Sequence, residues 1–93
     1  MSTLQINAGV LSLQGDFTHA TVARHLAAAN FLTLTAAATQ VDLSAVGQVD
    51  SSALGLLLTI KRRAVAQGRS VEMIHWPVGL IDLARLYGVF ELF

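Results

Sequence analysis

At 93 residues the chain is large enough for one domain with a single hydrophobic core and too small for two. Its 54% hydrophobic and 13% charged residues predict an apolar surface patch of the kind that marks partner contacts. Six basic and six acidic side chains cancel in charge, which argues against a nucleic-acid-binding protein.

The N-terminal segment has the pattern of a β-hairpin. Two runs of alternating polar and apolar residues, Leu4–Asn7 and Val10–Gln14, are separated by Ala8-Gly9. We expect Gly15-Asp16 to end the second strand.

The next segment predicts a helix capped by Thr18, with Val22 and Leu26 on its apolar face. Its end is ambiguous, because Asn30–Thr35 alternates as a strand does, whereas the alanines of Ala36–Ala38 favour a helix.

The central stretch, residues 41–64, predicts a strand, a loop and an amphipathic helix. Val41–Leu43 is typical of a buried strand, and Ser44–Gly47 supplies turn residues. The loop ends at Asp50-Ser51-Ser52, where any of the three side chains can accept a hydrogen bond from the first helical turn. Asp50 also complements the positive end of the helix dipole, so we predict that the helix starts here.

One stripe of this helix is predicted to lie on a sheet, and it contains Ala53, Leu56, Leu57, Ile60 and Ala64. The opposite side carries Gly55, Thr59 and Arg62, and Leu54 and Leu58 flank it. Glycine inside a helix costs about 1 kcal/mol relative to alanine, so Gly55 indicates close approach by another molecule. The alternative is a solvated surface on which the serines only cap the helix.

Beyond a C-cap at Gln67-Gly68, residues Ser70–His75 are predicted to form a third core strand. Pro77 then fits the first turn of a last helix, whose apolar stripe is Leu80, Leu83, Ala84 and Tyr87 and which Gly88 ends. The aromatic residues of the short tail Val89–Phe93 are expected either on the core or against a partner.

Strand–helix–strand units around residues 41–43 and 71–75 imply parallel strands, to which the hairpin adds an antiparallel pair. The predicted fold class is therefore α/β: one domain over residues 1–93, with a mixed β-sheet and helices packed mainly on one face.

Catalytic patterns are scarce. The sequence has no cysteine, and His19, His25 and His75 lie on three separate elements without metal-ligand spacing. It has neither a glycine-rich phosphate loop nor the G-x-S-x-G elbow that would make Ser51 a hydrolase nucleophile. We expect no enzyme activity, no cofactor and no metal. Without a signal-peptide pattern or an apolar run of about 20 residues, we expect a soluble cytoplasmic protein.

The run Asp-Ser-Ser-Ala-Leu-Gly-Leu-Leu-Leu from Asp50, after a Val-Asp-Leu-Ser strand, resembles the core motif of STAS domains. This family includes anti-sigma factor antagonists, sulfate-transporter tails and the MlaB subunits of bacterial phospholipid-transport ABC systems. Residues 80–89, Leu-Ile-Asp-Leu-Ala-Arg-Leu-Tyr-Gly-Val, resemble the corresponding helix of MlaB subunits. The pair Gly15-Asp16 matches a pair that precedes the first STAS helix, and the resemblance favours helix up to about Thr39 with a break at Asn30.

The resemblance implies a partner-binding surface, which comprises Asp50, Ser51, Ser52, Leu54, Gly55, Leu58, Thr59 and Arg62. For an MlaB-type subunit the partner is the ATPase subunit of an ABC transporter and, through it, the permease. Such a subunit lies in the cytoplasm, peripheral to the inner membrane, with no span of its own and no nucleic acid partner.

Two other functions remain as alternatives. The matching serine of anti-sigma factor antagonists is phosphorylated, which makes Ser51 a candidate phosphorylation site in a regulatory switch. An apolar surface could instead cradle a lipid or nucleotide in a free ligand carrier. Homo-oligomerisation is left open by the sequence.

Overall fold

The N-terminal hairpin consists of β1 (Ser2–Asn7) and β2 (Val10–Phe17), paired antiparallel. The computed structural model describes residues 2–93 of the chain. Ala8 and Gly9 both have positive φ angles, of 51° and 83°, as a tight two-residue hairpin turn requires. The hairpin prediction is confirmed, but Gly15-Asp16 does not end β2. The strand continues to Phe17, whose completely buried side chain fixes it against the core.

Two helices, α1 (His19–Ala27) and α2 (Phe31–Ala36), follow the hairpin, with the break near Asn30 that the family resemblance favoured. The first begins after Thr18, as predicted. The ambiguous stretch at the second is helical, which lets the buried Thr35 hydroxyl donate to the carbonyl oxygen of Phe31 at 2.9 Å. This hydrogen bond gives the buried Thr35 hydroxyl the partner that a polar group inside the core requires.

The third strand, β3 (Gln40–Val49), is longer than predicted. Ser44–Gly47 was expected to form a turn, yet these residues continue the strand and pair with β2 through an irregular register. The reason is a tertiary contact: Asp16 Oδ1 accepts a hydrogen bond from the N–H of Gln48 at 2.9 Å. A Cβ atom on Gly47 would lie only 2.6 Å from that oxygen, so the glycine serves a close approach rather than a turn.

The central helix α3 (Ser51–Ala66) begins and ends where the sequence predicts. Gly68, with φ of 70°, terminates it. The strand that follows, β4 (Glu72–Ile74), is shorter than the predicted Ser70–His75. His75 has a φ of 60°, a left-handed conformation that ends an extended strand.

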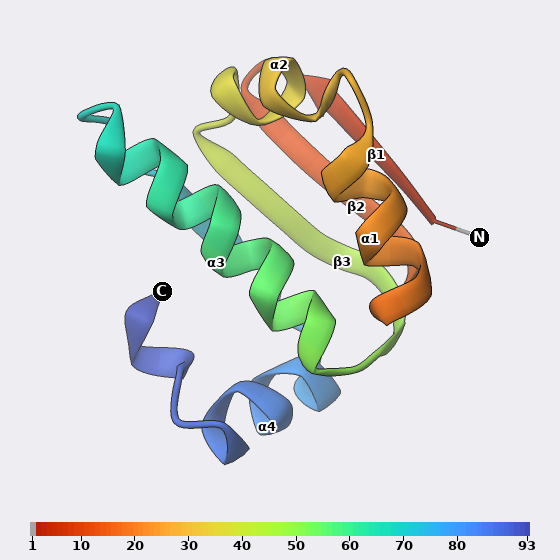
Figure 1. Cartoon of the computed structure of the whole chain (residues 1–93). Coiled ribbons are helices and arrows are strands. Elements are labelled where there is room, and N and C mark those ends of the chain that lie inside the picture. The colour runs from red at the N-terminus through yellow and green to blue at the C-terminus, as the bar shows by residue number, and fades with distance from the viewer. Residues whose placement is uncertain (1) are drawn as a thin grey trace.

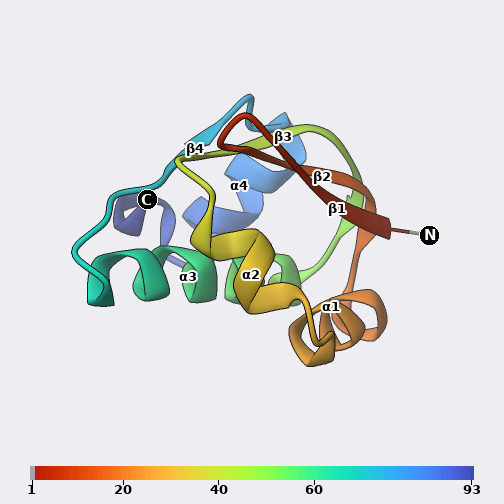
Figure 2. The same cartoon turned by 90° about the horizontal axis from the view of Figure 1, so that it is seen from above.

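The strands form one sheet in the order β1-β2-β3-β4, antiparallel at the hairpin and parallel elsewhere. The fold is thus the predicted mixed α/β arrangement. In Figure 2 the sheet lies above α1, α2 and α3, which cover one of its faces. Figure 1 shows α3 running alongside β3, with β1 at the far edge of the sheet.

The core lies between this helical layer and the sheet, and the predicted α3 stripe from Ala53 to Ala64 is buried there. The last helix, α4 (Val78–Leu86), follows Pro77 and adds Leu80 and Ala84 to the same core. Tyr87 does not belong to the buried stripe, since it is 56% exposed.

The C-terminal tail contains a short 3₁₀ turn, η1 (Phe90–Leu92). Its aromatic residues lie on the protein itself: Phe90 and Phe93 pack edge-on against Trp76, with ring centroids 5.3 and 5.2 Å away. Of the two alternatives left open for the tail, the structure shows packing on the core.

Candidate functional site

The N-terminus of α3 is organised by Asp50, the residue directly before the helix. Its Oδ1 atom accepts a hydrogen bond from the N–H of Ser52 at 2.8 Å, which caps α3 as predicted. Its Oδ2 atom accepts from the N–H of His19 at 3.0 Å, and the His19 ring nitrogen Nδ1 lies 3.5 Å from the same oxygen. One carboxylate therefore joins the starts of α1 and α3.

These bonds set the charge at the site. The hydrogen bond from the backbone N–H of His19, together with that from Ser52, lowers the pKa of Asp50 below its ordinary value. The carboxylate is therefore ionised at neutral pH and places a fixed negative charge at the positive end of the α3 dipole.

Two serines follow with different surroundings. Ser51, the first residue of α3, is exposed, whereas Ser52 is half-buried beside α1. A group attached to the Ser51 hydroxyl would point into solvent or into a docked partner. The helix N-terminus nearby would favour a negative charge on that group.

The predicted outer face of α3 is exposed at Gly55 and Arg62 and half-exposed at Leu58 and Thr59. A Cβ atom on Gly55 would meet nothing within 4 Å, so the glycine leaves a shallow depression on the helix. The Thr59 hydroxyl donates to the Gly55 carbonyl oxygen at 2.8 Å, which hides one polar group from an approaching molecule.

Leu54 does not flank this face. Its side chain is only 3% exposed and belongs to the core, so its prediction as a surface contact is wrong. Because α4 shares that core, α3 has to bury a wider stripe than contact with the sheet alone requires.

An apolar groove of about 320 Å³ runs between α1 and α3. It brings together residues of both helices: His19, Val22, Ala23, Leu26, Ser52, Gly55, Leu56 and Thr59. The sequence missed the contribution of α1. Leu26 was placed on the apolar face of this helix, and its side chain is 41% exposed. The high apolar content of the sequence did predict an exposed apolar surface, but composition alone does not show which residues form it. We call this surface, with the adjoining Ser51, the α1–α3 groove.

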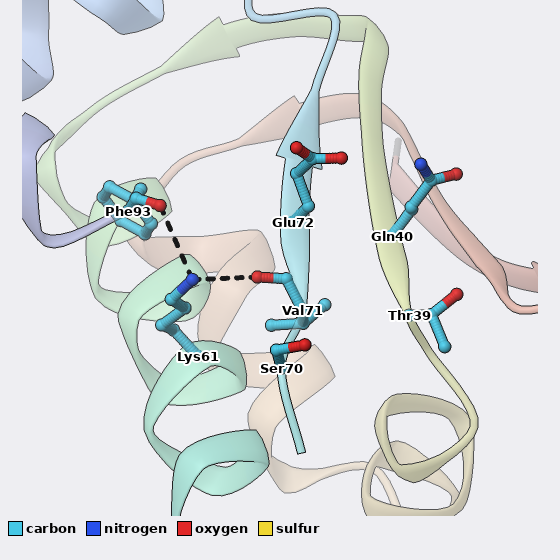
Figure 3. A pocket seen from close by; sticks show the side chains of 7 residues that line it. All are labelled: Thr39, Gln40, Lys61, Ser70, Val71, Glu72 and Phe93. Atoms are coloured by element: carbon cyan, nitrogen blue, oxygen red, sulfur yellow. Dashed lines mark hydrogen bonds between the residues drawn. The ribbon is translucent and has the colours of Figure 1, made fainter.

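A second hollow, of about 560 Å³, lies at the opposite end of α3 (Figure 3). Its side chains come from the β3 start, the β4 region, α3 and the tail, with Lys61 and Phe93 on one side of the β4 segment and Thr39 and Gln40 on the other. The Lys61 amine donates to the carbonyl oxygen of Val71 at 2.9 Å and to that of Phe93 at 3.5 Å. The lysine is thus engaged in holding the fold together.

The histidines do not lie on three separate elements, as was predicted, because His19 and His25 both belong to α1. His19 starts α1, His25 stacks on Phe17 with ring centroids 5.5 Å apart, and His75 lies 3.1 Å from Asp42 on the edge of the sheet. Within residues 2–93, no three His, Asp or Glu side chains gather as metal ligands do. In the same part of the chain, no helix combines the length and the hydrophobicity that crossing a bilayer requires.

The geometry defines a small α/β domain that presents an exposed helix N-terminus beside an apolar groove. Comparison with solved structures shows the same fold in the anti-sigma factor antagonist SpoIIAA in its unphosphorylated form. The match has a TM-score of 0.62 and 18% identity, and it covers all of this chain and 84% of that one. A second structure, described as Mglu, matches with a TM-score of 0.52 and 20% identity over 82% of this chain but only 20% of its own length.

The fold is thus that of a STAS domain. At the level of sequence, the family described as "Mlab, STAS domain" matches residues 2–93. The chain belongs to this family. A comparison with curated protein sequences gave no match.

Proposed function

We propose that this protein is a non-catalytic cytoplasmic subunit that docks on the ATPase subunit of an ABC transporter for phospholipids. In this proposal it regulates the ATPase and reaches the permease, and hence the inner membrane, only through it. The transporter would move phospholipids between the inner and outer membranes and so maintain the lipid asymmetry of the outer membrane. The observation that carries the proposal is the α1–α3 groove with Ser51 at its end.

The groove has the properties of a docking surface rather than of a catalytic site. It is apolar and shallow. Of the polar residues that line it, Thr59 donates its hydroxyl to the Gly55 carbonyl oxygen, and His19 and Ser52 donate their backbone N–H groups to the Asp50 carboxylate. A partner can therefore cover it without leaving those groups unpaired, which is the main cost of burying polar atoms. In protein–protein interfaces of this kind, the buried apolar centre contributes most of the binding free energy.

The choice of an ABC ATPase as partner is supported by the family, which carries the Mlab description, and by the Leu-Ala-Arg-Leu-Tyr helix of residues 83–87. A second candidate function is an anti-sigma factor antagonist switched by phosphorylation. It is favoured by the exposure of the Ser51 hydroxyl at a helix N-terminus, which a kinase could reach.

The first experiment compares two glycines that sit alike on helices. Gly55 and Gly79 are both exposed, and neither would bring a Cβ atom within 4 Å of another group. We expect Gly55→Leu to block binding to the ATPase subunit, because the side chain fills the groove, and Gly79→Leu to leave binding unchanged. Both variants should melt near the wild-type temperature. Wild-type co-purification of Gly55→Leu would place the partner elsewhere.

The second experiment concerns charge at Ser51. Ser51→Glu should keep the fold, since a helix N-terminus tolerates negative charge, but should abolish docking. Burying an unpaired charge against an apolar partner costs several kcal/mol, and each 1.4 kcal/mol is a tenfold loss of affinity. Ser51→Ala should weaken docking by about 1 kcal/mol or less. Unchanged affinity in Ser51→Glu would remove Ser51 from the interface.

Pull-down from native membranes followed by mass spectrometry separates the two functions. Capture of an ABC ATPase with its permease supports the transporter subunit. Capture of an anti-sigma kinase that phosphorylates Ser51 supports the antagonist and overturns the proposal.

A further inference from the structure

The outer edge of β1 is open. Strand β1 pairs with β2 on one side, and within residues 2–93 no strand pairs with its other side. Because residues of an antiparallel strand alternate in the direction of their backbone groups, half of the six residues of β1 present N–H and C=O groups at this edge. Such a row is a template for another strand.

The two edges of the sheet differ in protection. Strand β4, at the opposite edge, has only three residues and carries the charged Glu72. Short length and charge are two devices by which proteins prevent edge-to-edge pairing. Strand β1 has neither, since its sequence is Ser-Thr-Leu-Gln-Ile-Asn, without proline and without a charged side chain.

The uncharged surface extends beyond the strand. All twelve acidic and basic residues of the chain lie outside residues 1–15 and 26–41. These two stretches come together in space, because α2 packs against β1. Leu32 of α2 is 59% exposed, and a hollow of about 230 Å³ lined by Leu4 and Leu34 lies between the strand and the helices.

We propose that the protein forms a symmetric dimer in which β1 pairs antiparallel with β1 of a second copy. A two-fold interface brings each surface against itself, so any charge in it would face its own copy. An edge that lacks charge and offers matching donors and acceptors is self-complementary. Pairing about an axis perpendicular to the sheet joins the two four-stranded sheets and keeps both helical layers on one face. The α2 helices, with their exposed Leu32 side chains, then approach each other across the junction.

The α3 side of the α1–α3 groove lies away from the dimer junction, since α3 runs alongside β3 and β1 forms the far edge of the sheet (Figure 1). The proposal uses neither Ser51 nor the groove, so it stands or fails independently of the docking partner.

The test is sedimentation velocity of the full chain over a range of concentrations, with charge variants at Gln5. This side chain is exposed in the middle of β1, so Gln5→Lys and Gln5→Glu should leave the fold intact, which thermal melting checks. We expect the wild type to dimerise and each variant to weaken the dimer about threefold or more, because like charges then lie near each other across the junction. An equimolar mixture of the two variants should restore dimerisation as a heterodimer.

The matched control is Gln14→Lys, an exposed position one strand inward on β2. It should dimerise like the wild type. A wild-type chain that remains monomeric up to about 1 mM overturns the proposal. An equal effect of Gln5→Lys and Gln14→Lys overturns it too, because the copies would then associate through the face of the sheet.

Discussion

Replacing Asp50 by alanine removes two hydrogen bonds, one within the start of α3 and one to the start of α1. The bond to the N–H of Ser52 caps α3, and loss of such a cap costs about 0.5–2 kcal/mol. The bond from the N–H of His19 fixes the start of α1, and a hydrogen bond of this kind contributes about 0.5–1.5 kcal/mol. We expect Asp50→Ala to lose about 2 kcal/mol of the free energy of unfolding. For a domain of this size, that lowers the melting temperature by roughly 8–16 °C.

Asp50→Asn separates the two contributions. Asparagine is a good cap, so its amide oxygen can still accept from Ser52, but its NH₂ group cannot accept from His19. Thermal and urea unfolding should place this variant between the wild type and Asp50→Ala. An Asp50→Ala variant that melts with the wild type would refute the view that this carboxylate joins the two helices.

The acid limb of the stability curve gives an independent check. Because the hydrogen bonds lower the pKa of Asp50, the folded state binds fewer protons than the unfolded state in acid. Stability from this group is present above the ordinary aspartate pKa of about 3.9 and is lost as the pH falls through the lower folded value. Asp50→Asn should therefore flatten the dependence of melting temperature on pH in this range.

Three further predictions concern stability. Leu57→Ala should cost about 2–5 kcal/mol in urea unfolding, because the side chain is 1% exposed and leaves a cavity. Gly47→Ala should lower the free energy of unfolding by roughly 1 kcal/mol, because the added methyl group displaces Asp16 from its hydrogen bond with the Gln48 N–H. In a double-mutant cycle, the same change should have little effect when Asp16 is already alanine. Burial lowers the pKa of His25, so the melting temperature should fall as the pH drops below about 6.5, and His25→Gln should remove that part of the fall.

The sequence predicts well those features that neighbouring residues determine. The start of α3 follows from the chemistry of Asp50 and the serines after it, and the hairpin follows from alternation around Ala8-Gly9. Both features depend on interactions between residues close together in the chain, and such interactions can be recognised from a local sequence pattern.

Sequence-based prediction fails where the conformation or burial of a residue depends on a distant part of the chain. Gly47 has the composition of a turn, but it sits in a strand to admit the side chain of Asp16 from β2. Leu54 has the periodicity of a flanking position, but the core that α4 completes buries it. Half of the α1–α3 groove was missed for the same reason, since no local pattern shows that Leu26 remains exposed opposite Gly55.

The position of Lys61 has a consequence for the order in which the native fold opens. Its amine joins α3 to the carbonyl oxygens of Val71 and Phe93, which flank β4, α4 and the tail (Figure 3). Strand β4 pairs with β3 over only three residues, so few backbone hydrogen bonds attach residues 72–93 to the sheet. In native-state hydrogen exchange, residues 72–93 should open as one cooperative unit at a lower free energy than β1–β3. Acetylation of Lys61, or Lys61→Met, should lower that free energy further and leave the exchange of the hairpin amides unchanged.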